Sequence, residues 1–142
     1  MIGIASDHAG YEVKKELIEY LKAKNYEVKD YGCDNTDSVD YPVYAFKLCE
    51  DIKSLDKGIL ICTTGIGMSI AANKVKGIRC AKVDTVDEAV LTRMHNNSNV
   101  IAISALKNIN ETKKILDAFL ETSFSNEERH IRRNSMVDNY EH

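Results

Sequence analysis

Hydrophobic residues along the chain gather in short runs that alternate with longer segments of helical spacing. The apolar runs at 58–61 and 100–103 are unbroken, which is typical of strands buried on both faces of a parallel sheet. A similar run occupies residues 2–5. Alternating polar and apolar side chains predict another strand at 26–31, and a further strand is expected at 79–83. The pattern therefore predicts five strands.

The segments between these strands have the spacing of helices. The first helix follows Gly10 and carries an apolar stripe formed by Val13, Leu17, Ile18 and Leu21. Pro42, the only proline, suits the first turn of a second helix that continues through 44–52. A third helix, rich in alanine, is predicted to begin at Met68 and to run through Lys74.

Capping signals mark the start of the remaining helices. Thr85 and Glu88 are spaced as a capping box for a helix that is predicted to reach about Met94. Asn110 is expected to cap a helix whose apolar face contains Ile115, Leu116, Phe119 and Leu120. The segment 125–128 has the composition of a second capping box and predicts a last helix.

Strands that alternate with helices about five times, with short connections, predict a three-layer α/β/α sandwich around a five-stranded parallel sheet, a Rossmann-like fold. The chain has 142 residues, 44% of them hydrophobic, and no linker, repeat or low-complexity run divides it. We therefore expect residues 1–142 to form a single domain. The order of the strands in the sheet does not follow from the pattern.

Composition and charge narrow the classes of function. A net charge of -3 argues against nucleic acid as the main partner. No apolar stretch approaches the length of a signal peptide or a membrane span, so we expect a cytoplasmic protein that does not bind membranes. The cysteines are widely spaced and form no Cys-x-x-Cys pair, which argues against a disulfide framework and against a zinc site at Cys33, Cys49, Cys62 or Cys80.

The segment from Gly58 to Lys74 carries the candidate chemistry, because it joins a buried strand to a helix through a loop of small residues. Cys62 ends the predicted strand, and the amide groups at the helix start point back toward the loop, where they favour negative charge. Ligands of open α/β sheets bind at such loops. A thiol beside N–H donors suits removal of a proton next to a carbonyl, with the N–H groups holding the developing oxyanion. Alternatively, Cys62 is a buried, inert core thiol.

Three familiar loops do not fit this segment. A dinucleotide fingerprint needs glycine or alanine where Ile70 stands. A Walker loop needs lysine after Gly67, and Met68 stands there. A cysteine phosphatase needs an arginine a few residues beyond its cysteine, and none occurs between Cys62 and Lys74. Phosphate-loop chemistry of these kinds is therefore not expected.

Polar residues at other element ends are further candidates. Asp7 and His8 follow the first strand, so they also lie at a carboxyl end, although Asp7 could simply cap the next helix. Tyr41 comes before Pro42 and could belong to helix-cap packing or to the wall of a pocket. Each residue therefore has both a structural and a functional interpretation.

Two more candidates lie in the C-terminal half. His95 begins the polar cluster 95–99, which is either a helix end with its turn or the place of a titratable acid or base. Arg129 and Arg133 are four residues apart, so both guanidinium groups point the same way on the last predicted helix. Such a pair suits a phosphate, and the alternative is a solvated basic face.

Taken together, these motifs resemble the type B ribose-5-phosphate isomerase family, which also includes allose- and galactose-6-phosphate isomerases. The resemblance covers essentially the whole chain, and its specificity comes from the joint order and spacing of the motifs. The motifs are Asp7-His8-Ala9-Gly10, Tyr41-Pro42, Cys62-Thr63-Thr64-Gly65-Ile66-Gly67, Ala71-Ala72-Asn73-Lys74, His95-Asn96, and Arg129 with Arg133.

The resemblance implies an aldose-ketose isomerisation of a small sugar phosphate through an enediolate, with neither a metal nor another cofactor. Cys62 resembles the base that moves the proton between C2 and C1, and Thr64 the hydroxyl that helps proton traffic between the two oxygens. His95 resembles the acid that opens the sugar ring, assisted by Asp7. The substrate-binding positions implied are Asp7, Tyr41 and Asn96 for the sugar, the N–H groups of Thr63, Thr64, Gly65, Ile66 and Gly67 for the enediolate, and His8, Arg129 and Arg133 for the phosphate.

Membership of this family would also imply a homodimer with shared active sites, in which Cys62 works with His95 of the partner subunit. The sequence leaves open whether two dimers pair into a tetramer. Ribose 5-phosphate, a substrate of the non-oxidative pentose phosphate pathway, is the expected substrate. The alternatives are allose 6-phosphate, galactose 6-phosphate, and a sugar-phosphate-binding protein without turnover.

Two positions depart from the family pattern. The family usually has glycine where this chain has Thr63, and a position that needed a positive φ would strain a threonine. It also often has an arginine where this chain has Leu106, which would remove one phosphate contact. Some relatives use a glutamate as base at the position of Met68, so the methionine here favours Cys62 as the base.

Overall fold

The computed structural model describes residues 1–140 and confirms the predicted fold class. The strands are β1 (Ile2–Ser6), β2 (Val28–Asp30), β3 (Lys57–Cys62), β4 (Cys80–Lys82) and β5 (Val100–Ser104). The helices are α1 (Tyr11–Ala23), α2 (Tyr41–Glu50), α3 (Ile66–Ala72), α4 (Val86–Asn96), α5 (Ile109–Glu121) and α6 (Glu128–Asp138), with a 3-10 turn at Ile52–Ser54. None of the helices in this described part is long and apolar enough to cross a membrane.

All five strands are parallel and lie in the order β2-β1-β3-β5-β4. β2 lies on one side of β1, at one edge of the sheet. β3 lies on the other side of β1, and β4 and β5 lie beyond β3 toward the opposite edge. The direction of winding therefore changes between β1 and β3. In open α/β sheets ligands bind outside the carboxyl ends of the strands at this switch point.

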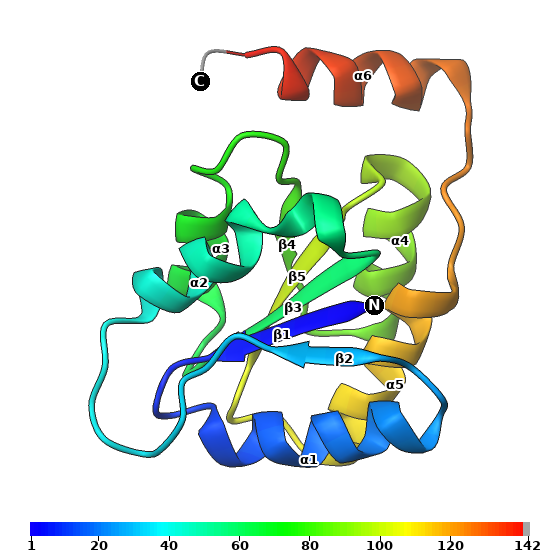
Figure 1. The fold of residues 1–142 in the computed structure, drawn as a ribbon. Helices are drawn as coiled ribbons and strands as arrows, with labels where there is room; N and C mark the ends of the chain where they lie inside the picture. Colours follow the sequence, from blue (N-terminus) through cyan, green and yellow to red (C-terminus); the bar gives the residue numbers. More distant parts are fainter. Residues whose placement is uncertain (141–142) are drawn as a thin grey trace.

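Helices cover both faces of the sheet (Figure 1). α1, α4 and α5 enclose one core, which contains Ile61 and Phe119, while α2 and α3 enclose a second core, which contains Leu60 and Met68. Neighbouring residues of a strand point to opposite faces, so Leu60 and Ile61 serve different cores. Burial on both faces explains why the central part of β3 is apolar at every position.

α6 stands apart from both helical layers. It lies beyond one end of the strands, next to the end of α4 (Figure 1). His130 is its only buried residue among those described, whereas Ile131 and Met136 are exposed. A small number of side chains therefore attaches α6 to the rest of the chain.

The capping box of α4 is confirmed in part. The N–H of Glu88 donates to Thr85 Oγ1 at 3.1 Å, as predicted. The Glu88 carboxylate accepts from the N–H of Asp84 at 3.1 Å rather than from that of Thr85. The Glu88 side chain therefore satisfies the N–H of the residue before the N-cap instead of the N–H of the N-cap itself.

α4 extends beyond its predicted end at Met94. It continues to Asn96 and stops where Asn97 adopts the left-handed conformation, with φ of 45°. Asparagine tolerates this conformation, so Asn97 terminates the helix. His95 and Asn96 consequently lie in the last helical turn instead of in the turn that follows it.

The predicted caps of the last two helices are wrong. Asn108, not Asn110, caps α5, and its side chain accepts from the N–H of Asn110 at 2.9 Å. α6 has Glu127 at its N-cap, without a side-chain cap bond. Ser125 accepts from the N–H of Glu127 at 3.3 Å and lies 3.0 Å from His130 Nδ1, so it holds a buried ring as well as the chain before the helix.

Candidate active site

The loop between β3 and α3 places a thiol beside a backbone donor. Cys62 is the last residue of β3 and is 6% exposed. Its Sγ accepts a hydrogen bond from the N–H of Gly65 at 3.2 Å. Such a donor stabilises negative charge on the sulfur. The loop thus holds Cys62 in a place where a thiolate has a partner.

Gly65 makes this turn possible. Its φ is 82°, and a Cβ there would lie 3.0 Å from the backbone of Ile103. Both the conformation and the close approach require glycine. The turn also starts α3 at Ile66, earlier than the predicted start at Met68.

The loop amides differ in how they are used. The N–H of Gly65 donates to Cys62, and that of Ile66 donates to Thr64 Oγ1 at 3.2 Å. Within residues 1–140, the N–H groups of Thr63, Thr64 and Gly67 have no hydrogen-bond acceptor. Three donors at the mouth of the loop are therefore available to a bound anion or oxyanion.

Thr63 has an ordinary backbone. Among the residues that the structure describes, the non-glycine residues with positive φ are Asn25, Asn97 and Asn126. The concern that threonine would be strained at position 63 is therefore wrong, because the left-handed residue of this loop is Gly65. Leu106, the second position that departs from the family pattern, is 77% exposed.

Ser104 braces the loop from the neighbouring strand. It ends β5 in register with Cys62, and its Oγ donates to the carbonyl of Thr63 at 2.6 Å. The same oxygen accepts from the N–H of Leu106 at 3.1 Å. We did not expect this role from the sequence, although a polar residue at the carboxyl end of an apolar strand is a signal that could have indicated it.

The β1–α1 loop lies at the same end of the sheet. The N–H of Asp7 donates to the carbonyl of Ile61 at 3.1 Å, and its carboxylate accepts from the N–H of Gly10 at 3.0 Å. Asp7 as a whole is 7% exposed. His8 Nδ1 accepts from the N–H of Val39 at 3.2 Å, which ties this loop to the segment before α2.

Tyr41 packs directly on the β3–α3 loop. A Cβ added to Gly67 would lie 2.6 to 2.9 Å from atoms of the Tyr41 ring and its hydroxyl. Tyr41 therefore lies against the loop as well as forming the first residue of α2. We call Asp7, His8, Tyr41 and residues 62–67 the carboxyl-edge cluster; they surround the switch point between β1 and β3.

The other three thiols are in different surroundings. Burial raises the pKa of Cys49 to about 12, with a further contribution from Glu50. Burial also raises the pKa of Cys80, and Cys49 adds to this effect. Cys33 is buried and its Sγ donates to the carbonyl of Asn35 at 3.3 Å. Among the four, Cys62 is the thiol whose sulfur accepts a hydrogen bond from a backbone N–H.

His95 and Asn96 lie at the end of α4, and both are exposed. The His95 ring centroid is 4.5 Å from that of His130, with the two rings tilted by 38°. The carbonyl of His95 accepts from Asn134 Nδ2 at 3.1 Å. These contacts join the end of α4 to α6.

Arg129 and Arg133 are exposed on α6. Arg129 pairs with Glu127 at 2.8 Å, and both side chains are about half exposed, so this pair contributes little to stability. We call His95, Asn96, Arg129 and Arg133 the amino-edge cluster. They share the region of α4 and α6 that lies beyond the starts of the strands.

The two clusters lie at opposite ends of the sheet. Val100, the first residue of β5, pairs with Gly58, whereas Cys62 pairs with Ser104. At about 3.3 Å per residue, these two levels are about 13 Å apart along the strands. His95 precedes Val100 in the chain and lies beyond that level. Within one chain, therefore, the structure does not bring His95 together with Cys62.

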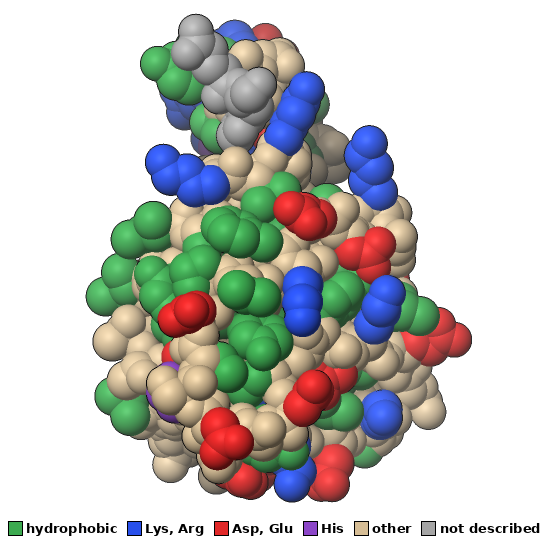
Figure 2. Space-filling model, turned by 60° about the vertical axis from the view of Figure 1, so that its left-hand side comes forward, with side chains coloured by type: hydrophobic (Ala, Val, Ile, Leu, Met, Phe, Trp, Pro, Cys, Tyr) green, Lys and Arg blue, Asp and Glu red, His purple; other side chains and the backbone are tan. Residues whose placement is uncertain are grey.

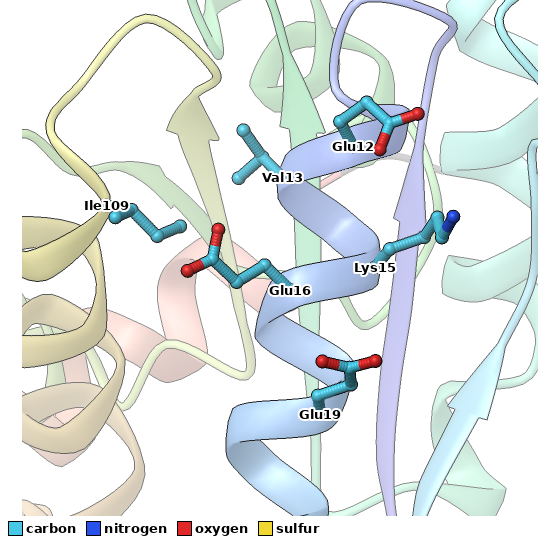
Figure 3. A pocket seen from close by; sticks show the side chains of 6 residues that line it. All are labelled: Glu12, Val13, Lys15, Glu16, Glu19 and Ile109. Atoms are coloured by element: carbon cyan, nitrogen blue, oxygen red, sulfur yellow. The ribbon is translucent and has the colours of Figure 1, made fainter.

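A groove along α1 is large, but it is unsuited to an anion. It has a volume of about 480 Å³ and is lined by Glu12, Val13, Lys15, Glu16, Glu19 and Ile109. Figure 3 shows that the three glutamates come from successive turns of α1, while Ile109 belongs to the start of α5. Three carboxylates beside one ammonium repel a phosphate. None of the residues of either cluster lines this groove.

Metal ligands do not gather in the described residues: within 1–140, no group of three or more His, Cys, Asp and Glu side chains is placed to hold a metal ion.

A second cleft of about 330 Å³ lies beneath α6 and is lined mainly by polar residues, including Arg79, Asn96 and Asn134. Arg79 was expected only as the start of a strand. No local pattern in the sequence indicates its contacts, because they reach residues far along the chain.

Comparisons with known proteins agree with this architecture. The model of the Ribose/Galactose Isomerase family matches residues 2–137. Ribose-5-phosphate isomerase B of Mycobacterium tuberculosis is 40% identical over 144 residues, which cover 97% of this chain and 88% of that protein. A ribose 5-phosphate isomerase structure from Thermotoga maritima has 46% identity and a TM-score of 0.93, covering 96% of each chain. The ribose-5-phosphate isomerase B structure from Clostridium thermocellum has 41% identity and a TM-score of 0.93, covering 96% of this chain and 94% of its own.

Proposed function

The chain belongs to the ribose/galactose isomerase family, and we propose that it interconverts ribose 5-phosphate and ribulose 5-phosphate with Cys62 as the base. The named relatives are ribose-5-phosphate isomerases, which supports a sugar phosphate isomerase of type B. The observation that carries the proposal is the position of the Cys62 thiol, 3.2 Å from the Gly65 N–H and beside three amides without acceptors.

The chemistry is a proton transfer between adjacent carbons of the open-chain sugar. The Cys62 thiolate takes the proton from C2 of the aldose, and the electron pair of that bond forms an enediolate whose charge rests on the C1 oxygen. The N–H groups of Thr63, Thr64 and Gly67 stabilise this charge. The Thr64 hydroxyl carries the proton of the C2 oxygen to the C1 oxygen, and the thiol returns its proton to C1 to give the ketose. A general base contributes about 10² to 10⁴ in rate, and one oxyanion donor about 10² to 10³.

The remaining residues prepare the substrate. His95 protonates the ring oxygen and so opens the furanose, while Asp7 accepts the proton of the anomeric hydroxyl. Asn96 and Tyr41 contact the sugar. His8, Arg129 and Arg133 bind the phosphate, for which the two guanidinium groups are well suited. Binding of the phosphate away from the reacting carbons holds C2 near Cys62.

A complete pocket requires two copies of the chain. Because the two clusters lie at opposite ends of one sheet, we propose a homodimer in which Cys62 faces His95 of the partner subunit. A two-fold axis makes this arrangement reciprocal, so each dimer has two pockets. Apolar side chains gather on the face formed by α2 and α3 (Figure 2), where Val43, Phe46, Ile66 and Ile70 are 37 to 58% exposed. An exposed apolar face of this kind supports a protein interface.

The experiment that tests the function is a coupled assay of the purified protein with ribose 5-phosphate, allose 6-phosphate and galactose 6-phosphate side by side. We expect the highest kcat/KM with ribose 5-phosphate. Preference for a six-carbon substrate would reassign the substrate within the same chemistry. Binding without turnover of any of the three would establish a sugar-phosphate-binding protein and overturn the isomerase.

A further inference from the structure

Arg79 links the end of α4 to α6. It precedes β4, and its side chain is 16% exposed at the end of the sheet where the strands begin. Its Nη1 donates to both carboxylate oxygens of Asp138 at 2.8 Å. Its Nε donates to the carbonyl of Asn96 at 3.0 Å, and its Nη2 to that of Asn97 at 2.9 Å. One guanidinium thus serves the last residues of two helices.

Both kinds of contact are strong ones. The last carbonyls of a helix lack intrahelical donors and carry partial negative charge, so a cation there is favourable. A guanidinium bonded to a carboxylate is held in a defined orientation, because its donors are fixed in one plane. Asn99 adds to this by accepting from the main-chain N–H of Arg79 at 2.9 Å. Arg79 is therefore itself held in place from two sides.

Within residues 1–140, the hydrogen bonds and the ring contact that join α6 and the segment before it to α4 involve the first part or the middle of α6, and Val137 of its last turn lines the cleft beside Arg79. The N–H of Ser125 donates to the carbonyl of Met94 at 3.1 Å, ahead of the helix. The His130 ring lies against His95, and Asn134 donates to the His95 carbonyl. Without the bond to Asp138, the last turn of α6 would lose its attachment to Arg79, and the helix could tilt about its first turns.

We propose that Arg79 is a positioning residue that sets the placement of Arg129 and Arg133 relative to His95 and Asn96. The proposal rests on the proposed function, because it assigns these four residues to one pocket. Through Asp138, Arg79 controls the helix that carries the phosphate-binding arginines. Through the carbonyls of α4, it controls the helix end that carries the ring-opening histidine.

Two variants separate these connections. Asp138→Asn weakens only the attachment of α6, so we expect KM for ribose 5-phosphate to rise about fivefold while kcat stays within about twofold. Arg79→Gln also releases the end of α4, so we expect a similar rise in KM and, in addition, a fall of about tenfold in kcat. Arg79→Lys keeps the charge without the planar fork and should restore part of both parameters.

Glu128→Gln is the matched control. It removes the same charge from the same helix, but Glu128 pairs with Arg132 within α6, at 3.0 Å. We expect its KM and kcat to equal those of the wild type. Amide hydrogen exchange provides a readout that does not depend on substrate: the last turns of α6 should exchange about tenfold faster in Asp138→Asn and unchanged in Glu128→Gln.

Asp138→Asn could exchange faster and still have the same KM as Glu128→Gln. The ion pair between Arg79 and Asp138 would then be merely structural, and the proposal would be overturned.

The double variant Arg133→Ala with Asp138→Asn is a further test. Asp138→Asn should then add little to the rise in KM, because its effect operates through the arginine. Absence of turnover in the wild type would be a failure of the proposed function instead. Calorimetric affinity for ribose 5-phosphate then decides: binding that is about fivefold weaker in Asp138→Asn than in Glu128→Gln supports the positioning role, and equal affinities overturn it.

Discussion

The two clusters of site residues differ in how the fold holds them. The carboxyl-edge cluster follows buried strands directly, so Cys62 and Asp7 are less than a tenth exposed and backbone hydrogen bonds hold their loops. The amino-edge cluster lies on helix ends, with His95 and Arg129 in solvent and α6 attached by a few side-chain contacts. One cluster is continuous with the core, while the other is peripheral to it.

The difference suits two different tasks. Proton abstraction from carbon needs a desolvated base and rigid donors, because electrostatic interactions are stronger where water is excluded. Capture of a phosphate, the task proposed for Arg129 and Arg133, suits exposed guanidinium groups that can form charge-assisted hydrogen bonds. In the proposed dimer, each pocket would combine the buried Cys62 and Asp7 of one chain with the exposed side chains of the amino-edge cluster of the other.

The largest expected effect is that of Cys62→Ala. We expect kcat to fall by about 10² to 10⁴ while ribose 5-phosphate still binds, because the thiol acts on a carbon-bound proton and not on the phosphate. Cys80→Ala, which removes another thiol, is the control and should retain wild-type turnover. Steady-state kinetics and calorimetric binding check both variants. Near-normal turnover of Cys62→Ala would remove the thiol from the mechanism.

Mixed dimers test whether the clusters of two chains meet. Cys62→Ala and His95→Ala chains, unfolded and refolded together in equal amounts, should recover about a quarter of wild-type activity, since half of the dimers are mixed and each has one intact pocket of two. Each parent alone should stay nearly inactive. If mass measurements show mixed dimers but no activity returns, His95 serves the pocket that contains Cys62 of its own chain, because every pocket of the mixture then keeps one defect.

Removal of the arginines should have a moderate effect that is confined to binding. We expect Arg129→Ala and Arg133→Ala to raise KM by about 10-fold or more, because each loses a charge-assisted bond of about 1.5 to 3 kcal/mol that is similar in ground and transition states. Arg132→Ala is the control, since Arg132 pairs with Glu128 along α6. An unchanged KM in both test variants would make Arg129 and Arg133 part of an ordinary solvated face.

The smallest expected effect concerns the pH dependence of stability at the amino edge. Burial lowers the pKa of His130 in the fold, and His95, Arg129 and Arg133 lower it further, against an opposing contribution from Glu127. Below about pH 6.5, the unfolded chain therefore binds more protons at His130 than the folded chain does. The free energy of unfolding consequently declines on acidification from that pH. Urea unfolding between pH 7 and pH 5 should show a shallower decline for His130→Gln than for the wild type. An equally steep decline in the variant would assign this pH dependence to other groups.

Local sequence signals predicted most of the elements but fewer of their ends. The unbroken run before Cys62 predicted a strand buried on both faces, and β3 has this burial. The wrong cap at Asn110 and the early end assigned at Met94 have one cause: several polar residues follow one another there, and only three-dimensional packing selects which one ends the helix.

The sequence by itself determined the fold class and the loop that carries the candidate base, because hydrophobic period, glycine and capping residues act over a few positions. Only the tertiary structure decided where the candidates lie relative to one another. The parallel pairing of β5 with β3 puts His95, which precedes β5, at the end of the sheet opposite Cys62, and Arg79 meets Asp138 across 59 residues of chain. Such long-range pairings depend on the packing of whole elements, which leaves no periodic trace in the sequence.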